Sequence, residues 1–257
     1  MTPVLDVTKL GIDFGGLQAL DDFNIQVFDN EIVGLIGPNG AGKTTVFNLL
    51  TSVYQPSRGS IALSGHNTKG KKTYEVTQSG IARTFQNIRL FKGISVVDNV
   101  KIALHHGMRY SLLETFFRFP SYWGQEKESE EKALELLSVF DMQDIAETKA
   151  GSLPYGAQRR LEIVRALATN PKILLLDEPA AGMNPSETAE LMNNIRAIRD
   201  RFKIAIVIIE HDMSFVMGIC ERILVLNYGL IIAAGTPDEI KRNPSVIEAY
   251  LGQQRAN

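Results

Sequence analysis

The stretch that decides the fold reads Gly37-Pro38-Asn39-Gly40-Ala41-Gly42-Lys43-Thr44-Thr45. It fits the pattern G-x-x-x-x-G-K-[ST], whose glycines let the backbone turn with positive φ and point several N–H groups at one place. The apolar run Ile32 to Ile36 precedes it and the helical-looking run Val46 to Leu50 follows, as the pattern requires. A glycine-rich turn without a ligand is the alternative, and this setting argues against it. We therefore predict that residues 37–45 bind nucleotide phosphates.

Two side chains of this loop have specific expected roles. The ammonium of Lys43, together with the positive end of the following helix, is expected to meet the β-phosphate. The hydroxyl of Thr44 is expected to bind Mg²⁺. The loop therefore predicts a nucleotide with Mg²⁺ beside its phosphates.

A second segment supplies the carboxylates that a phosphate loop lacks. The apolar run Ile173 to Leu176 leads directly into Asp177 and Glu178. Because α/β sheets place ligands at the C-terminal ends of their strands, we predict that Asp177 holds Mg²⁺ through its water shell. Glu178 would orient or deprotonate an attacking water. A helix-capping pair before Pro179 is the alternative, and the presence of Lys43 in the same chain disfavours it.

Two further polar residues stand where expected strands end. Gln86 closes a short strand and could contact Mg²⁺ or the attacking water, although an ordinary surface glutamine is the alternative. His211 ends the strand Ile204 to Ile209 and could donate to a γ-phosphate oxygen, or it could be a satisfied strand-end histidine. Glu210 is a rival to Glu178 as the base, but it does not adjoin the metal carboxylate.

The composition excludes several classes of protein. The formal charge of −2 argues against a dominant nucleic-acid face, so no nucleic-acid partner is expected. Cys220 is the only cysteine, which allows no internal disulfide and points to a reducing compartment. The N-terminus lacks a signal peptide, and no apolar run approaches the roughly 20 residues that span a bilayer. We expect a cytoplasmic chain whose membrane link runs through a partner.

The order of elements predicts an α/β fold. The first third reads as strands around the Gly15-Gly16 turn, and the last third alternates apolar strands with helices, which indicates a parallel sheet covered on both faces. Between them the pattern is helical, and Ala133, Leu136, Leu137 and Phe140 form one apolar stripe. We expect one nucleotide-binding domain over 1–257. Its parts are a catalytic core with a β subdomain (1–90 and 160–235), a helical insertion (91–159) and C-terminal helices (236–257).

Aromatic residues are concentrated in the insertion. Residues 107–123 contain Tyr110, Phe116, Phe117, Phe119, Tyr122 and Trp123. These rings could pack the insertion onto the helical part. Alternatively, some of them could stay exposed as a docking patch for a membrane partner.

The motifs come in an order that resembles the nucleotide-binding subunit of ATP-binding cassette transporters. This resemblance implies a P-loop NTPase cassette with a mixed RecA-like core, an antiparallel β subdomain and a helical subdomain. It also implies ATP as substrate, Mg²⁺ as cofactor and an aromatic residue stacking on adenine, here Phe14. The signature loop maps to Leu153-Pro154-Tyr155-Gly156-Ala157, and the D-loop maps to Ala181-Gly182-Met183-Asn184.

One branch of that family is closer still. Residues 83–91, 180–185 and 210–213 resemble the LivG-type ATPase of bacterial branched-chain amino acid importers. This sequence departs from the wider family's pattern at Pro154, which has neither hydroxyl nor N–H, and at Asn184, which stands where the family usually has an aspartate. Contact with a nucleotide across a dimer would then depend on the N–H of Gly156 and the following helix, with Tyr155 as an extra donor.

The resemblance also implies partners. These are a second cassette, identical or related, transmembrane permease subunits, and indirectly a solute-binding protein outside the cell. The chain would then lie peripherally on the inner face of the cell membrane. Rival readings are a cassette ATPase for urea, amides or another small solute, a regulatory or translation-associated cassette protein, and a DNA-repair cassette. The last would need a long coiled-coil insertion, and no sustained heptads are present.

Overall fold

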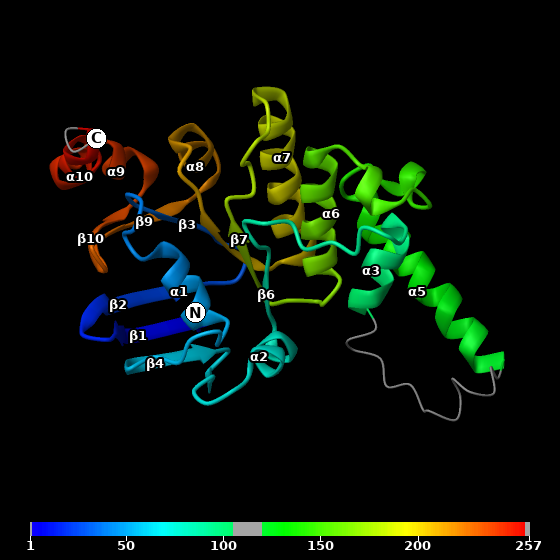
Figure 1. Cartoon of the computed structure of the whole chain (residues 1–257), viewed down its shortest axis with the longest axis horizontal. Coiled ribbons are helices and arrows are strands. Elements are labelled where there is room, and N and C mark those ends of the chain that lie inside the picture. Colours follow the sequence, from blue (N-terminus) through cyan, green and yellow to red (C-terminus); the bar gives the residue numbers. More distant parts are fainter. Residues whose placement is uncertain (1, 105–119, 255–257) are drawn as a thin grey trace.

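The structure is a computed structural model that describes residues 2–104 and 120–254 (Figure 1). The side chains of the aromatic segment 107–123 lie outside the described part, so both interpretations of that segment stay open. None of the helices that the structure describes is both long and apolar enough to cross a bilayer.

A six-stranded sheet forms the centre of the molecule. Its spatial order is β10-β9-β3-β8-β7-β6, and all neighbours pair in parallel except β9 and β10. Every residue of β3, β7 and β8 is buried, as expected for parallel strands covered on both faces. The strands span β3 (Ile32–Ile36), β6 (Ile81–Arg83), β7 (Ile173–Asp177), β8 (Ala205–Ile209), β9 (Arg222–Asn227) and β10 (Leu230–Gly235).

A second sheet is antiparallel and has the order β2-β1-β4-β5. In Figure 1 this antiparallel sheet lies below α1. Its strands are β1 (Leu5–Phe14), β2 (Leu17–Val27), β4 (Arg58–Leu63) and β5 (His66–Asn67). The expected Gly15-Gly16 turn joins β1 to β2, with positive φ at both glycines.

The helices divide into those that cover the central sheet and those that extend from it. In Figure 1, α3 and α5 lie beside α6 on the side opposite the C-terminal helices. The described helices are α1 (Lys43–Leu50), α2 (Thr73–Ser79), α3 (Val96–Leu104), α5 (Pro120–Ser138), α6 (Tyr155–Leu167), α7 (Pro185–Phe202), α8 (Met213–Ile219), α9 (Pro237–Arg242) and α10 (Pro244–Gln254), with short 3₁₀ turns η2 (Gln143–Ile145) and η3 (Ala150–Ser152).

Two hydrophobic cores lie on opposite faces of the central sheet. Successive strand residues alternate between them, so that Leu174 and Leu176 join the core under the helices, while Ile173 and Leu175 join the core shared with α1 and the antiparallel sheet. Cys220 is buried in the first core, and burial raises the pKa of its thiol to about 12. The parallel strands are therefore held from both sides, which fixes the positions of their ends.

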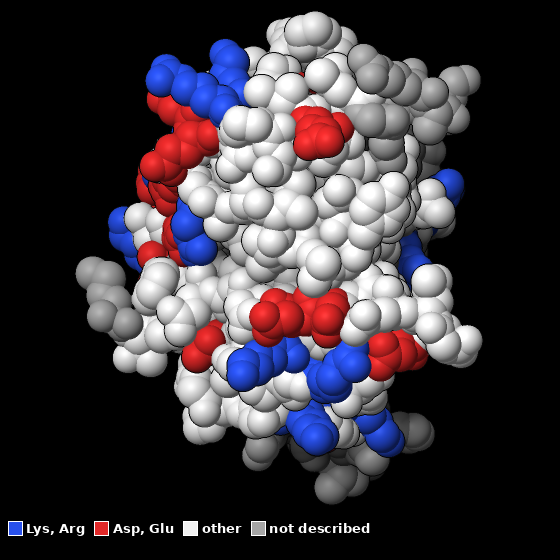
Figure 2. Space-filling view, turned by 90° about the vertical axis from the view of Figure 1, so that its left-hand side faces the viewer, with Lys and Arg blue, Asp and Glu red and all other residues white. Residues whose placement is uncertain are grey.

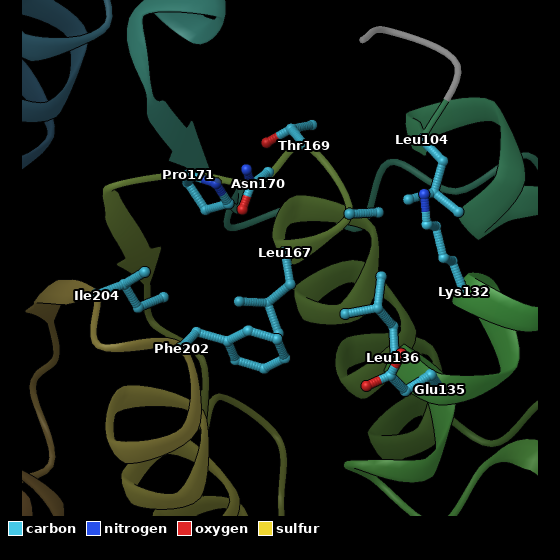
Figure 3. Close-up of a pocket in the computed structure, with 11 residues that line it drawn as sticks. Leu104, Lys132, Glu135, Leu136, Leu167, Thr169, Asn170, Pro171, Phe202 and Ile204 are labelled. Atoms are coloured by element: carbon cyan, nitrogen blue, oxygen red, sulfur yellow. The ribbon is translucent and has the colours of Figure 1, made fainter. Parts of the chain in front are cut away.

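The ends of four helices enclose an apolar pocket of about 440 Å³ (Figure 3). Leu104, Leu136, Leu167 and Phe202 line it, one from each of α3, α5, α6 and α7. The pocket lies where the helical segment meets the edge of the sheet.

The α/β fold expected from the sequence is confirmed, with local differences. Phe140 lies beyond the end of α5, although it is buried with Ala133 and Leu137 as the stripe predicted. Strand β10 was not expected, because Leu230–Gly235 is only partly buried and its pattern is weak. The division into parts stays a prediction, and the boundary at 159 falls inside α6.

Charged side chains of both signs are mixed on one face of the molecule. Figure 2 shows small groups of acidic and basic residues at the rims of a broad uncharged area. In the antiparallel sheet, Arg58 pairs with Asp13 and Asp21 at 3.2 and 3.3 Å. This face therefore carries no extended field of a single sign.

Candidate active site

The predicted phosphate loop connects β3 to α1. Gly37, Gly40 and Gly42 have φ angles of 152°, 77° and 106°, which L side chains rarely adopt. A Cβ on Gly37 would lie 2.0 Å from the carbonyl oxygen of Leu226 on β9. Glycine is therefore required at position 37 both for its conformation and for the close approach of β9.

The loop folds around the side chain of Lys43. Its Nζ donates to the carbonyl oxygens of Gly37 and Pro38 at 2.7 and 2.9 Å, and the residue is 9% exposed. Burial lowers the pKa of Lys43, and the nearby charges of Glu178 and Asp177 oppose this shift. A positive charge is thus concentrated inside the loop.

The other loop residues differ in exposure. Pro38 and Ala41 are buried and Thr45 is half-buried, whereas Asn39, Gly40 and Thr44 are exposed. The N–H of Ala41 donates to the Pro38 carbonyl at 3.2 Å and closes a tight turn. The hydroxyl-bearing side chain of Thr44 is therefore accessible at the start of α1.

Asp177 and Glu178 occupy different environments at the end of β7. Asp177 is 4% exposed, and its Oδ2 lies 2.7 Å from Nη2 of Arg83. Glu178 is half-buried and has a φ of 49°, and its N–H donates to the Ile209 carbonyl at 2.9 Å. The left-handed conformation of Glu178 turns the chain at the end of β7.

Gln86 and His211 both approach Glu178. Nε2 of Gln86 donates to Glu178 Oε2 at 2.9 Å, and Nδ1 of His211 lies 4.0 Å from Glu178 Oε1. The four strands that end here, β3, β8, β7 and β6, are consecutive in the sheet. Their carboxyl ends therefore bring together Lys43, His211, Asp177, Glu178 and Gln86, which are far apart in the sequence.

Glu210, the rival base, is committed to the backbone. It is 1% exposed, and its two carboxylate oxygens accept from the N–H groups of Ala180 and His211 at 2.9 and 3.1 Å. Burial raises the pKa of Glu210, and these hydrogen bonds oppose the shift. These contacts give Glu210 a structural role, which is to hold the turn after Glu178.

Phe14 lies at the end of β1 and remains 42% exposed. Its ring packs edge-on against Tyr54, with centroids 5.2 Å apart and an interplanar angle of 73°. The adjoining strand β2 lies beside the loop, since a Cβ on Gly42 would be 3.1 Å from the Ala19 carbonyl oxygen. An accessible aromatic surface is therefore carried by the hairpin that borders the loop.

Tyr155 and Gly156 begin α6, with Pro154 as the N-cap. Tyr155 is 46% exposed, and a Cβ on Gly182 would lie 3.2 Å from its ring. Asn184 caps α7 by accepting from the Glu187 N–H at 3.0 Å, which explains why asparagine is tolerated there. The signature and D-loop segments thus lie side by side at the exposed start of α6.

Sequence reasoning missed a buried ion pair that ties α6 to the loop around Gln86. Arg159 is 2% exposed, bonds the carbonyl oxygens of Phe85 and Gln86, and pairs with Glu162 at 3.1 Å. Glu162 accepts from the N–H groups of Phe85 and Arg89, and burial raises the pKa of Glu162. The sequence did offer one signal for this ion pair. Arg159 and Glu162 have opposite charges and lie three residues apart on the apolar face of the expected helix.

The oxygen donors at this site suit Mg²⁺. Thr44, Gln86 and Asp177 offer a hydroxyl, an amide and a carboxylate oxygen. Within residues 2–104 and 120–254, no group of three or more His, Cys, Asp or Glu side chains could hold a metal. Mg²⁺ is usually held by one or two carboxylates together with substrate phosphates, and Asp177 supplies such a carboxylate.

Comparisons with known proteins point to one family. The family model described as ABC transporter matches residues 20–181, and the one described as branched-chain amino acid ATP-binding cassette transporter matches residues 231–256. Two curated relatives are each 45% identical over 251 residues, which is 98% of this chain and of each relative. They are the high-affinity branched-chain amino acid transport ATP-binding proteins BraF of Pseudomonas aeruginosa and LivG of Escherichia coli K12.

Solved structures agree with the sequence relatives. The ADP conformation of an ATP-binding cassette of an ABC transporter has a TM-score of 0.85 and 30% identity, and the match covers 98% of this chain and 100% of that one. A nucleotide-free cassette from an ABC transporter has a TM-score of 0.84 and 31% identity, with coverages of 97% and 99%.

Proposed function

The chain belongs to the ABC transporter family, and on that premise we propose that it is the ATP-hydrolysing subunit that powers a branched-chain amino acid importer. The observation that carries the proposal is the convergence of Lys43, Gln86, Asp177, Glu178 and His211 at one edge of the sheet. The curated relatives, whose names specify branched-chain amino acid transport, support the choice of solute.

In this proposal each group of residues has a separate role in phosphoryl transfer. The N–H groups of residues 37–45 and the ammonium of Lys43 bind the β- and γ-phosphates, and Phe14 stacks on adenine. Thr44, Asp177 and Gln86 would hold Mg²⁺, which would neutralise charge on the phosphate oxygens when bound.

Glu178 acts on the attacking water. The water oxygen forms a bond to the γ-phosphorus as the bond to the β–γ bridging oxygen breaks, and the water's proton passes to the Glu178 carboxylate. Gln86 already bonds Glu178 at 2.9 Å and would orient it, while His211 donates to a γ-phosphate oxygen. The products are ADP and inorganic phosphate.

A second cassette completes the site in this proposal. Tyr155 and Gly156 lie at an exposed helix start in contact with Gly182 and Glu187. In this proposal they present the Gly156 N–H and the Tyr155 hydroxyl to the γ-phosphate held by a partner subunit. Two head-to-tail cassettes would close around two ATP molecules and separate after hydrolysis.

The membrane partners would contact the groove beside the Gln86 loop. This groove has a volume of about 470 Å³, and Phe85, Arg89, Ile102 and Arg165 contribute to its lining. We propose that permease subunits dock there on the inner face of the cell membrane, with a solute-binding protein acting from outside. A permease for urea, amides or another small solute is the second candidate.

The test is solute uptake by the complete transporter. Vesicles that contain this chain with its co-purifying membrane subunits and binding protein should accumulate leucine when ATP is supplied. Glu178→Gln should bind ATP yet abolish both hydrolysis and uptake, since the amide cannot accept the proton. Accumulation of urea or amides without leucine would overturn the solute. Undiminished turnover in Glu178→Gln would overturn the role of Glu178.

A further inference from the structure

Arg83 connects the two elements that carry the expected metal ligands. Its Nη2 lies 2.7 Å from Asp177 Oδ2 on β7, and its Nη1 donates to Asn48 Oδ1 on α1 at 2.7 Å. Asn48 lies four residues after Thr44, so the two side chains share one face of α1. One guanidinium thus bridges the helix of Thr44 and the strand of Asp177.

The guanidinium of Arg83 is fixed in place. The side chains of Arg83 and Asp177 are both 6% exposed, and Cζ of Arg83 lies 5.4 and 5.1 Å from the ring centroids of Phe47 and Phe85. Within the described part of the chain, the buried Nε of Arg83 has no hydrogen-bond partner. Charged side chains are almost never this buried unless they are paired, and an unpartnered buried donor calls for an explanation.

The bond to Arg83 leaves the carboxylate of Asp177 capable of a second interaction. The ion pair with Arg83 uses Oδ2 of Asp177, and a carboxylate can accept through both of its oxygens. A neighbour that holds one oxygen fixes the plane in which the other faces a metal and its waters. The guanidinium also gives the buried carboxylate of Asp177 a partner of opposite charge.

We propose that Arg83 is a positioning residue for the metal site: it sets the spacing between Thr44 and Asp177 and the orientation of the Asp177 carboxylate. This inference rests on the proposed function, because it assumes that these two residues hold Mg²⁺. The opposite possibility is that Arg83 competes with the metal for Asp177. For the metal to displace Arg83 from Asp177, the guanidinium would have to move away from two aromatic rings and from Asn48.

The test measures metal affinity separately from nucleotide affinity. The chain saturated with ADP is titrated with Mn²⁺, and the free ion is followed by its EPR signal. In Arg83→Met, the affinity for Mn²⁺ should fall about ten- to hundredfold, as expected when a ligand-orienting neighbour is removed. The affinity for ADP without metal should change far less.

Two further variants separate positioning from charge. Arg83→Lys keeps a cation beside Asp177 but loses the planar fork to Asn48, so its Mn²⁺ affinity should be intermediate. Asn48→Ala leaves the ion pair intact and should also weaken Mn²⁺ binding, with an effect that is not additive with that of Arg83→Met. If Arg83→Met does not fold, Asn48→Ala still decides the question.

Arg222→Met is the matched control. Arg222, at the start of β9, also pairs with a carboxylate, that of Glu31 at 2.8 Å, and bonds the Gln26 carbonyl oxygen on β2, but it lies outside the site. Its removal should leave Mn²⁺ affinity unchanged. Unchanged or tighter Mn²⁺ binding in Arg83→Met would overturn the proposal, as would equal losses of ADP affinity with and without metal. If the unmodified chain failed to bind ADP at all, the proposed function itself would fail.

Discussion

At the scale of single residues, the site brings groups of opposite charge near one another. Burial lowers the pKa of Lys43, and the negative charges of Glu178 and Asp177 oppose this shift, while Asp177 is paired with Arg83. The buried charge of Asp177 therefore has a counterpart in Arg83, which makes its burial tolerable.

Removal of the loop's ammonium should abolish nucleotide binding. Lys43→Ala takes away the positive charge inside the loop and leaves the carbonyl oxygens of Gly37 and Pro38 without their donor. Fluorescence titration with a labelled ATP should show no saturable binding. Lys172→Ala is the control, because the side-chain ammonium of that exposed lysine bonds only Ser64 among the described residues. ATP binding at the original affinity in Lys43→Ala would refute the assignment of the loop.

At the scale of elements, α6 is fastened to the segment that carries Gln86. Arg159 and Glu162 bond the backbone of residues 85–89 from one helix face, and Tyr155 and Gly156 begin the same helix. A displacement of Gln86 should therefore be shared by the signature loop. In a closed dimer, α6 would connect the Gln86 segment at one nucleotide site with the signature loop at the other.

Disruption of that buried pair should be destabilising. Arg159→Met leaves the Glu162 carboxylate buried without its cation and should lower the free energy of unfolding by about 3–5 kcal/mol. Urea denaturation followed by circular dichroism measures the change. Arg201→Met is the control, since its pair with Glu135 is exposed and such pairs contribute about 0–1 kcal/mol. Equal stability of the two variants would show that the Arg159 pair does not hold α6.

At the scale of the whole molecule, the segments expected to contact ATP lie on two different surfaces. The phosphate loop and its carboxylates lie at one edge of the sheet, while Tyr155 and Gly156 lie at the start of α6. If each surface contributes to a different nucleotide, hydrolysis requires association.

The specific ATPase activity should therefore rise with protein concentration. Initial rates at saturating ATP should increase faster than linearly until the dimer dominates. Light scattering should show that Glu178→Gln accumulates dimers with ATP and monomers without it. A constant specific activity in a strictly monomeric preparation would contradict a shared site.

Much of the site could be predicted because its parts are local patterns. Residues 37–45 form a loop that a strand and a helix flank in the sequence itself, and Asp177 and Glu178 follow an apolar run. Strands of one parallel sheet end at one edge, so the sequence predicted where Gln86 and His211 would meet them. The element types were predictable for the same reason, since apolar runs and helical stripes are properties of neighbouring residues.

Contacts between distant residues needed the tertiary structure. The sequence alone leaves Glu210 as a rival base, but its two carboxylate oxygens accept from the N–H groups of Ala180 and His211. Arg83 belonged to a family motif, but only the packing of α1 against β6 and β7 joins it to Asn48 and Asp177. The sequence by itself determined which elements form and which residues stand at their ends, because these depend on spacing along the chain. The tertiary structure decided which of those groups are paired, because pairing depends on burial and on distances of a few ångströms between elements.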